Sequence, residues 1–279
     1  MNKDRKKIGI IGFGNMGSAI AERLKSNYDI SVTDKDARKT SNIAGLRVVS
    51  NNITLIKIVD ALILAVKPQD FDVCLNEIKK YIEDKLIISI AAGISCSHIE
   101  RILGKERLIR VMPNLAAKIG KGMSCISKGN FASEVDLEFS KKIFNELGEI
   151  LVIEENLMNA ATAVSGSGPG FFYWLIKDKP QKDWLDFAKN VFTLALSKAA
   201  ENIGFSQEQA LILAKATGEG SLALLKTTHL SPKELCSQVA SKGGTTQAGL
   251  GVLERGGSLI EAVKAALKRS QELSRSSEA

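Results

Sequence analysis

The sequence contains few of the residues on which histidine and thiol chemistry depend. It has two histidines, His98 and His229, so a histidine-based catalytic pair has few candidates. No two of the four cysteines have the CxxC spacing of a zinc or redox site. The cysteines are Cys74, Cys96, Cys125 and Cys236. We therefore expect no metal site and no disulfide framework, which is typical of a reducing cytoplasm.

Two further absences exclude classes of partner. Aromatic residues make up only 5% of the chain, and the net charge of +7 comes from lysines and arginines that are scattered along it. A nucleic-acid interface more often has a basic stripe with interleaved aromatics. No apolar run reaches the roughly 18 residues of a membrane span. The charged start MNKDRKK leads directly into a strand-like run and does not resemble a secretion signal. We expect a cytoplasmic protein that binds neither nucleic acid nor membrane.

Short β-branched runs alternate with amphipathic helical segments through the first half of the chain. The composition, 44% hydrophobic and 25% charged, is that of a globular protein with a sizeable core. Runs such as 8–12 and 61–66 are apolar on both faces, as buried parallel strands are. The segments 15–26 and 70–83 have helical periodicity. This alternation predicts an α/β fold in which residues 1–155 form a dinucleotide-binding domain with a Rossmann-type doubly wound sheet.

From residue 156 onward, Ala- and Leu-rich helical stretches replace the strand-like runs. The clearest stretches span 192–204, 206–228 and 258–274. Ser206 and Ser258 are expected N-caps, because a Gln or Glu follows each of them three residues later. Several stretches are apolar on more than one face, which favours burial against a second subunit. We expect residues 156–279 to form an all-helical C-terminal dimerisation domain in a homodimer or larger homo-oligomer.

A glycine-rich turn, GFGNMG, spans residues 12–17 between the first predicted strand and the first predicted helix. Gly12 permits a tight turn, and Gly14 lets backbone N–H groups approach a pyrophosphate. Gly17 allows close packing of helix on strand, and the helix N-terminus favours negative charge. An acidic residue, Asp34, follows about 20 positions later, as in dinucleotide-binding folds. Together these features predict that the turn binds NADH or NADPH.

The residues around Asp34 bear on the choice between the two cofactors. A carboxylate at the end of the second strand can accept hydrogen bonds from a ribose 2′-OH and repels a 2′-phosphate, which favours NADH. Lys35, Arg38 and Lys39 follow directly and could instead hold a 2′-phosphate, or they could form a solvated helix face. The carboxylate favours NADH, and the basic residues leave NADPH open.

A second glycine-rich stretch, SKGGTTQAG at 241–249, also precedes a helical segment. Together with GFGNMG, AVKPQ, SIAAGIS, RVMPN and AVSGSGPG, it resembles the ordered motifs of the pyrroline-5-carboxylate reductase family. The resemblance extends over essentially the whole chain, and the GGTT loop is its most specific element. It implies an oxidoreductase that transfers a hydride from NAD(P)H to the ring imine of 1-pyrroline-5-carboxylate. The product would be L-proline, in the last step of proline biosynthesis.

The resemblance also implies which residues form the site. The substrate carboxylate is expected at the GGTT loop, where Gly243 and Gly244 can adopt positive φ and expose consecutive N–H groups. Ser241, Thr245 and Thr246 would add hydroxyl donors in a substrate-binding helical domain, with Thr246 beside the ring nitrogen as the catalytic residue. Cofactor contacts are expected from Gly12, Phe13, Gly14, Asn15, Met16, Gly17, Asp34, Asn52, Ala65, Val66, Lys67, Pro68 and Asn114.

The chain departs from the family pattern in its loops. Lys242 stands where a proline usually precedes GGTT, and the lysine loosens the turn. Leu115 and Ala116 replace the Thr-Pro that usually follows MPN, which removes a hydroxyl from this region. The details of the substrate pocket are therefore left open.

Two departures lie in the helical half. Residues 176–191 are expected to be an insertion in which Pro180 breaks a helix. Leu194 and Lys198 occupy positions where acidic residues are common in the family. These differences leave the mode of subunit assembly open.

Two other functions remain possible on the sequence alone. A β-hydroxyacid-type NAD(P) dehydrogenase shares the Rossmann half and the helical half, but its catalytic lysine would have to be Lys198 or Lys215. A non-catalytic NAD(P)-binding sensor would account for the departures, but it would not need intact SGSGP and GGTT loops.

Overall fold

The computed structural model describes residues 5–41 and 43–278, and the chain divides into two compact units. Unit 1 comprises Met1–Val111 and Ile126–Glu146, and unit 2 comprises Met112–Cys125 and Leu147–Ser277. The predicted domain ranges also include residues 1–4, 42 and 279, which lie outside the described residues. The predicted boundary between residues 155 and 156 stays a prediction.

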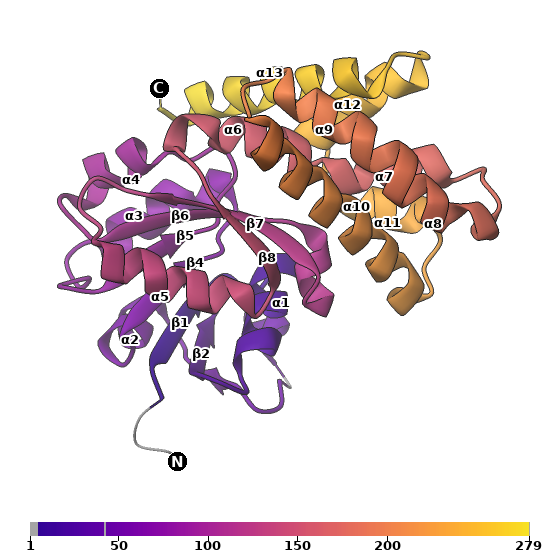
Figure 1. Ribbon diagram of the computed structural model, residues 1–279. Helices are drawn as coiled ribbons and strands as arrows, with labels where there is room; N and C mark the ends of the chain where they lie inside the picture. Colours follow the sequence, from indigo (N-terminus) through magenta and orange to yellow (C-terminus); the bar gives the residue numbers. More distant parts are fainter. Residues whose placement is uncertain (1–4, 42, 279) are drawn as a thin grey trace. The chain divides into compact units, whose positions relative to one another are not determined.

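Within the described residues, eight strands form one sheet in the order β3-β2-β1-β4-β5-β6-β7-β8 (Figure 1). They span Lys7–Ile11 (β1), Asp29–Thr33 (β2), Arg47–Val48 (β3), Ala61–Leu64 (β4), Leu86–Ser89 (β5), Leu108–Pro113 (β6), Gly122–Lys128 (β7) and Gly148–Val152 (β8). The pairings of neighbours from β3 to β6 are all parallel. The strand order reverses between β1 and β4, and ligands of open α/β sheets bind beside such a point.

The central strands of unit 1 are buried because their apolar residues run without alternation, whereas both residues of the edge strand β3 are exposed. β4 and β5 are buried along their whole length, and β1 exposes only Lys7. In register, Ile8 of β1 lies opposite Ile30 of β2 and Ala61 of β4, and all three are buried. A parallel sheet with helices on both faces has no solvent side, so its central strands need continuous apolar runs.

Five α-helices complete the described part of unit 1. They span Asn15–Leu24 (α1), Asn52–Lys57 (α2), Phe71–Ile78 (α3), Cys96–Leu103 (α4) and Glu134–Asn145 (α5). α2, α3 and α4 pack in succession. Tyr28, which follows α1 in the chain, contacts Phe139 of α5 edge-on, and the two ring centroids are 6.3 Å apart. The predicted Rossmann-type sheet is confirmed.

Unit 2 is mainly helical. Its α-helices span Met158–Ala161 (α6), Gly168–Ile176 (α7), Trp184–Asp186 (α8), Thr193–Glu201 (α9), Gln207–Thr228 (α10), Pro232–Val239 (α11), Thr245–Glu254 (α12) and Leu259–Glu278 (α13). The core gathers large side chains from α7 and the residues before α9, including Phe171, Phe172, Tyr173 and Phe192. The predicted all-helical second half is confirmed, although α11 was not foreseen as a separate helix.

The segment predicted as an insertion joins this core. α7 ends at Ile176, and Pro180 precedes a 3₁₀ turn, Gln181–Asp183 (η6), which leads through α8 into a π-helical segment, Phe187–Phe192 (η7). The ring centroid of Phe172 lies 6.2 Å from that of Phe187 and 5.2 Å from that of Phe192. Pro180 therefore lies at a break between helices, and the residues after it pack against α7.

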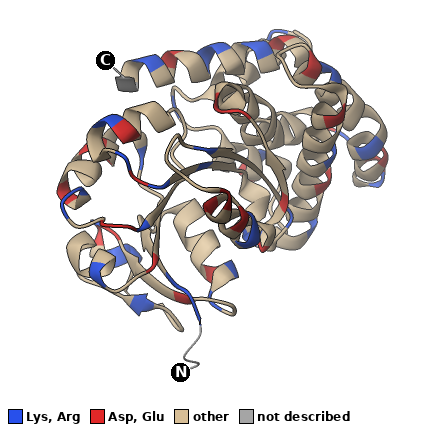
Figure 2. Ribbon diagram, turned by 60° about the vertical axis from the view of Figure 1, so that its left-hand side comes forward, with Lys and Arg blue, Asp and Glu red and all other residues tan. Residues whose placement is uncertain are grey.

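Several global features bear on function. No helix in the described part of the chain is long and apolar enough to cross a bilayer. Among the same residues, no group of three His, Cys, Asp or Glu side chains could hold a metal ion. The cysteines are free thiols, and burial raises the pKa of Cys74 and of Cys125 to about 12, so neither is a reactive thiolate. In Figure 2, basic and acidic positions are interspersed along the helices.

Candidate active site

The turn after β1 has the geometry of an anion-binding loop. Gly12 has a φ of +97°, and a Cβ there would lie 2.5 Å from the carbonyl oxygen of Ala65. A Cβ on Gly17 would lie 2.0 Å from the carbonyl oxygen of Gly12. Around Gly14, by contrast, no atom lies within 4 Å of the place a Cβ would take. Two glycines are thus required by crowding, and the third leaves the backbone open to a ligand.

The helix that follows this turn has no side-chain cap. Its N-cap, Gly14, is extended and offers no side-chain acceptor. In the described chain, most α-helices that begin after an extended residue are capped by a side chain, and the exceptions are α1 and α12. The capping residues are Asn51, Ser95, Ser133, Ser206 and Ser231. The first-turn N–H groups of α1 therefore remain available to an anion.

The turn borders a cavity of about 790 Å³ in unit 1, at the reversal between β1 and β4. The predicted cofactor residues that line it are Gly12, Gly14, Asp34, Asn52, Ala65, Val66 and Lys67. Those that do not line it are Phe13, Asn15, Met16, Gly17, Pro68 and Asn114. A volume of this size accommodates a large part of a dinucleotide.

The cavity also has a wall that motif reasoning missed. Its additional lining residues are Ile11, Thr33, Lys35, Lys39, Ser50, Asn51, Gln69, Asp70, Val73, Cys74 and Glu77. Asn52 Nδ2 donates to Glu77 Oε2 at 2.8 Å, so α2 and α3 are joined at this wall. Glu77 lies on a helix with no motif, and only the packing of α2 on α3 brings it to the cavity.

Asp34 is held as an ionised carboxylate at the end of β2. Its side chain is 5% exposed. The amides of Phe13 and Asp36 donate to its two oxygens at 2.7 and 2.8 Å, and Lys39 Nζ lies 3.2 Å from both. Burial alone would raise the pKa of Asp34, but these hydrogen bonds outweigh it and the pKa is lowered. The carboxylate therefore also fixes the phosphate turn, through Phe13.

The other basic residues after β2 have carboxylate partners of their own. Lys35 Nζ lies 2.7 Å from Asp70 Oδ1. Arg38 Nε lies 2.8 Å from Asp36 Oδ1, and this hydrogen bond lowers the pKa of Asp36 to about 2. Each positive charge in this group is thus offset by a neighbouring carboxylate.

The GGTT loop of unit 2 is a tight turn that differs from the expectation. Gly243 has a φ of +71°, and Gly244 N donates to Ser241 O at 3.0 Å, as in a type II turn. Gly244 itself is extended, with a φ of −84°, and a Cβ there would lie 2.3 Å from Ser241 Oγ. The prediction that both glycines have positive φ and expose their N–H groups is wrong for Gly244. Its N–H closes the turn, and Gly243 N–H donates to Gln247 Oε1 at 2.6 Å.

The donors at this loop are therefore those of the next helix. α12 begins at Thr245 after Gly244, with no side-chain cap. An uncapped α-helix leaves its first-turn N–H groups without partners inside the helix. The free N–H groups start two residues later in the chain than predicted, at Thr245, and include those of Thr246 and Gln247.

The fold brings the SGSGPG motif to the GGTT loop. The hydroxyl oxygens of Ser167 and Thr245 lie 2.9 Å apart. Thr246 is 4% exposed, and its Cγ2 lies 2.4 Å from where a Cβ on Gly170 would be. Only glycine leaves room for Thr246 at that point of α7. Motif reasoning gave Ser167 no role, because its partner lies 78 residues away in the sequence.

Asn114, in unit 2, uses its side-chain oxygen but not its side-chain nitrogen in hydrogen bonds to the described residues. It is 2% exposed, and its Oδ1 accepts from the amide of Met123 at 3.1 Å. Its Nδ2 is buried and has no partner among the described residues. An unpaired buried amide is costly, so it is suited to an acceptor that a ligand supplies. Leu115 and Ala116, which follow, are buried in a 3₁₀ turn.

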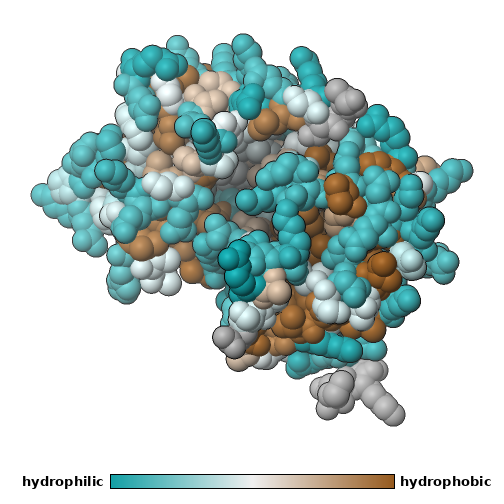
Figure 3. All heavy atoms as spheres, turned by 180° about the vertical axis from the view of Figure 1, so that it is seen from behind, coloured by the Kyte–Doolittle hydropathy of each residue, from teal (hydrophilic) through white to brown (hydrophobic). Residues whose placement is uncertain are grey.

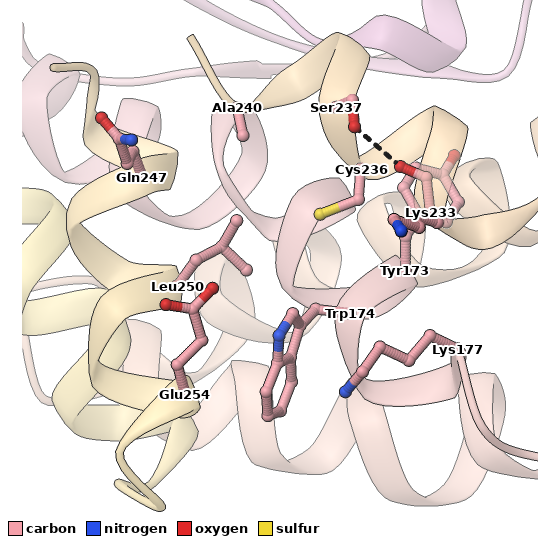
Figure 4. Close-up of a pocket in the computed structure, with 10 residues that line it drawn as sticks. All are labelled: Tyr173, Trp174, Lys177, Lys233, Cys236, Ser237, Ala240, Gln247, Leu250 and Glu254. Carbon is pink, nitrogen blue, oxygen red and sulfur yellow. Dashed lines mark hydrogen bonds between the residues drawn. The ribbon is translucent and has the colours of Figure 1, made fainter. Parts of the chain in front are cut away.

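A second cavity, of about 330 Å³, lies among α7, α11 and α12 (Figure 4). Trp174 of α7 and Lys177, the C-cap residue of this helix, face it, with the ammonium 3.7 Å from the indole centroid. Cys236 also lines it, and burial raises the pKa of this thiol while its Sγ lies 3.5 Å from Gly170 O. Gln247 at the start of α12 borders the cavity, which thus adjoins the GGTT loop.

The lysines required by the hydroxyacid dehydrogenase alternative are poorly placed. Lys215 is exposed on α10. Lys198 is 67% exposed and pairs with Glu201 at 3.9 Å. Neither ammonium is held in a cavity where it could reach a substrate.

Comparison with known proteins places these features in a family. Residues 190–273 match the model for pyrroline-5-carboxylate reductase dimerisation, and residues 7–93 match that for NADP oxidoreductase, coenzyme F420-dependent. The pyrroline-5-carboxylate reductase of Aquifex aeolicus is 36% identical, covering 90% of each chain. That of Pisum sativum is 34% identical, covering 97% of each. The chain belongs to the pyrroline-5-carboxylate reductase family.

Solved structures agree with this assignment. The pyrroline carboxylate reductase of Plasmodium falciparum, with NADP bound, has a TM-score of 0.63 and 28% identity, covering 96% of this chain and 98% of the other. The family, the two-part fold class and the oxidoreductase class predicted from the motifs are confirmed.

Proposed function

We propose that this protein reduces 1-pyrroline-5-carboxylate to L-proline with a hydride from NADH or NADPH. The observation that carries the proposal is the pair of uncapped helix starts, α1 after GFGNMG and α12 after SKGG. The reaction needs two bound anions, the cofactor's pyrophosphate and the substrate's carboxylate. Each motif supplies an N-terminal helix end with unpaired N–H groups for one of them.

The residues of unit 1 fit a dinucleotide. The open backbone at Gly14 and the start of α1 would hold the pyrophosphate, and Asp34 would accept hydrogen bonds from the adenosine ribose. Ala65–Pro68 and Asn52 would contact the riboses, and the unpaired Nδ2 of Asn114 would donate to the nicotinamide end. When bound, the cofactor supplies the hydride.

In unit 2, the substrate carboxylate would lie at the first turn of α12, with hydroxyl donors from Ser241 and Thr245. Thr246 would accept from the ring N–H, which keeps the protonated imine oriented. A protonated pyrrolinium is already electrophilic, so little acid–base catalysis is needed and orientation supplies most of the rate. Ser167 and Gly170 support this arrangement, because they fix Thr245 and leave room for Thr246.

We further propose that NADH is preferred. The lowered pKa of Asp34 keeps it ionised at neutral pH, and a carboxylate repels a 2′-phosphate. The nearby basic side chains are already paired with carboxylates. The Plasmodium relative has NADP bound, so this preference would distinguish the present chain from it.

We also propose a cytoplasmic homodimer or larger homo-oligomer, with helical residues 156–279 as the assembly domain. The dimerisation model matches residues 190–273 of this helical part. Large apolar side chains are exposed there, among them Val191 at 50%, Leu194 at 64% and Leu211 at 48%. In the view of Figure 3, apolar side chains reach the surface among hydrophilic ones. A second copy would bury such side chains.

Purified protein should oxidise NADH when 1-pyrroline-5-carboxylate is added, and it should not reduce NAD when β-hydroxyacids are added. Turnover of hydroxyacids alone would instead support the dehydrogenase alternative. Cofactor binding without any turnover would support the sensor.

Thr246→Val tests the catalytic assignment. Loss of a hydrogen bond to a charged ring nitrogen should lower kcat/KM by roughly 10- to 100-fold, with cofactor affinity unchanged. Thr227→Val, on an exposed turn of α10, is the matched control. Full activity in Thr246→Val would remove the role given to this hydroxyl.

A further inference from the structure

Gly243 is held at both of its backbone polar groups by side chains. Its N–H donates to Gln247 Oε1 at 2.6 Å, and its carbonyl oxygen accepts from Arg269 Nε at 2.7 Å. Arg269 lies on α13, 26 residues further along the chain, and its Nη1 donates to Glu272 Oε2 at 3.0 Å. No motif points to Arg269, so the contact is visible only in the structure.

These two hydrogen bonds fix the two peptide planes that define the turn. The N–H of Gly243 belongs to the plane shared with Lys242, and that plane has opposite orientations in type I and type II turns. The carbonyl of Gly243 belongs to the plane shared with Gly244, whose N–H closes the turn onto Ser241. Gln247 holds the first plane and Arg269 holds the second. The direction in which α12 starts depends on both.

The turn needs such support because its own residues restrict it little. Gly243, at φ +71°, is in a region that glycine enters without cost but also leaves readily. Position 242 is the second residue of the turn, where proline would fix φ near −65°. The chain has lysine there. The ordering that a proline would give must therefore come from outside the turn.

We infer that Arg269 is a positioning residue for the substrate loop: it fixes the carbonyl of Gly243 and thereby aims the first-turn N–H groups of α12 at the substrate carboxylate. The inference rests on the proposed function. Arg269 acts through the loop backbone, and its side chain, 36% exposed, needs no contact with the substrate. A guanidinium suits this task because it can hold Gly243 and Glu272 at once with its fixed donors.

The experiment compares Arg269→Ala and Arg269→Lys with Lys268→Ala, the exposed neighbour on the same helix. Losing a hydrogen bond from a charged group should raise the KM for 1-pyrroline-5-carboxylate by roughly 10- to 100-fold in Arg269→Ala. The KM for the cofactor should stay unchanged, since all of the expected cofactor contacts except Asn114 lie in unit 1. Arg269→Lys should recover part of the loss, and Lys268→Ala should match the parent protein. Equal effects on both KM values would show a general structural defect and overturn the inference.

A second substitution separates positioning from direct contact. Lys242→Pro in the Arg269→Ala background should lower the substrate KM by roughly two- to fivefold, because proline restricts the turn without any help from α13. The Lys242 N–H donates no hydrogen bond within the described residues, so proline removes none. No recovery would mean that Arg269 contacts the substrate directly. If the parent protein does not turn over the imine, the proposed function fails. If it does and Arg269→Ala is unaffected, only this inference fails.

Discussion

The cofactor preference can be tested at Asp34, where the structure predicts two separable effects. Asp34→Ser removes a negative charge beside the expected ribose and also removes an acceptor for the Phe13 amide. The first effect changes the discrimination between NADH and NADPH. The second effect loosens the phosphate-binding turn and weakens the binding of both cofactors equally. The informative quantity is therefore the ratio of the two kcat/KM values.

The size of the change follows from the contacts. A hydrogen bond from a ribose hydroxyl to a charged acceptor contributes about 1.5–3 kcal/mol to binding. Loss of this hydrogen bond should therefore weaken the binding of NADH by roughly 10- to 100-fold. For NADPH, the same substitution removes a repulsion between like charges. Two unit charges 4 Å apart near a protein surface interact by about 4 kcal/mol, and the ammonium of Lys39 already offsets part of this. The ratio of NADH to NADPH efficiency should fall by at least about tenfold.

Steady-state rates with each cofactor at saturating imine provide the assay. Asp34→Asn is the matched variant, since it keeps the shape and one acceptor oxygen while removing the charge. Lys39→Ala should act in the opposite direction, because it leaves the carboxylate less neutralised and strengthens rejection of a 2′-phosphate. The lowered pKa of Asp34 means that it stays ionised across the neutral range, so the ratio should not change with pH there. An unchanged ratio in both Asp34 variants would refute the reasoning.

Two further predictions concern unit 2. Gly170→Ala should force Thr246 aside, lowering stability by about 1–3 kcal/mol in urea unfolding and reducing imine turnover. Gly251→Ala is the control, because the nearest atom to a Cβ there is 3.5 Å away. Its helix propensity should raise the free energy of unfolding by up to about 1 kcal/mol. Equal losses of stability in both variants would exclude a specific clash at Gly170. Leu194→Glu should shift sedimentation towards the monomer if this exposed leucine lies at the subunit interface. Unchanged mass at all concentrations would place the interface elsewhere.

Much of the fold could be predicted because local signals and the final structure agree. Apolar runs such as 8–12 and 61–66 became buried parallel strands, whereas Arg47–Val48, in the run at 47–49, became an exposed edge strand. The spacing of Ser206 to Gln209 and of Ser258 to Glu261 produced the expected capping hydrogen bonds. These features depend on residues that are close in the sequence. Propensity and pattern therefore suffice for them.

The site was less predictable where its contacts are remote in sequence or its backbone is crowded. Gly244 is extended and lies close to Ser241 Oγ. This conformation could not be predicted from the sequence, because glycine can adopt either sign of φ. The pairing of Ser167 with Thr245 and the contact of Arg269 with Gly243 join segments from different motifs or from none. Only the packing of the helices in unit 2 brings these residues together.

The two uncapped helix starts have a physical consequence that links the fold to the chemistry. Replacing an N-cap side chain costs a helix about 1 kcal/mol, and most other helices here that follow an extended residue keep such a cap. Glycine stands instead at positions 14 and 244, because at each position a side chain would either fill the space a ligand needs or collide with the loop. An anion bound at either end offsets the missing cap through the same N–H groups. Both cofactor and substrate should therefore raise the unfolding temperature when added separately, each by stabilising its own helix start.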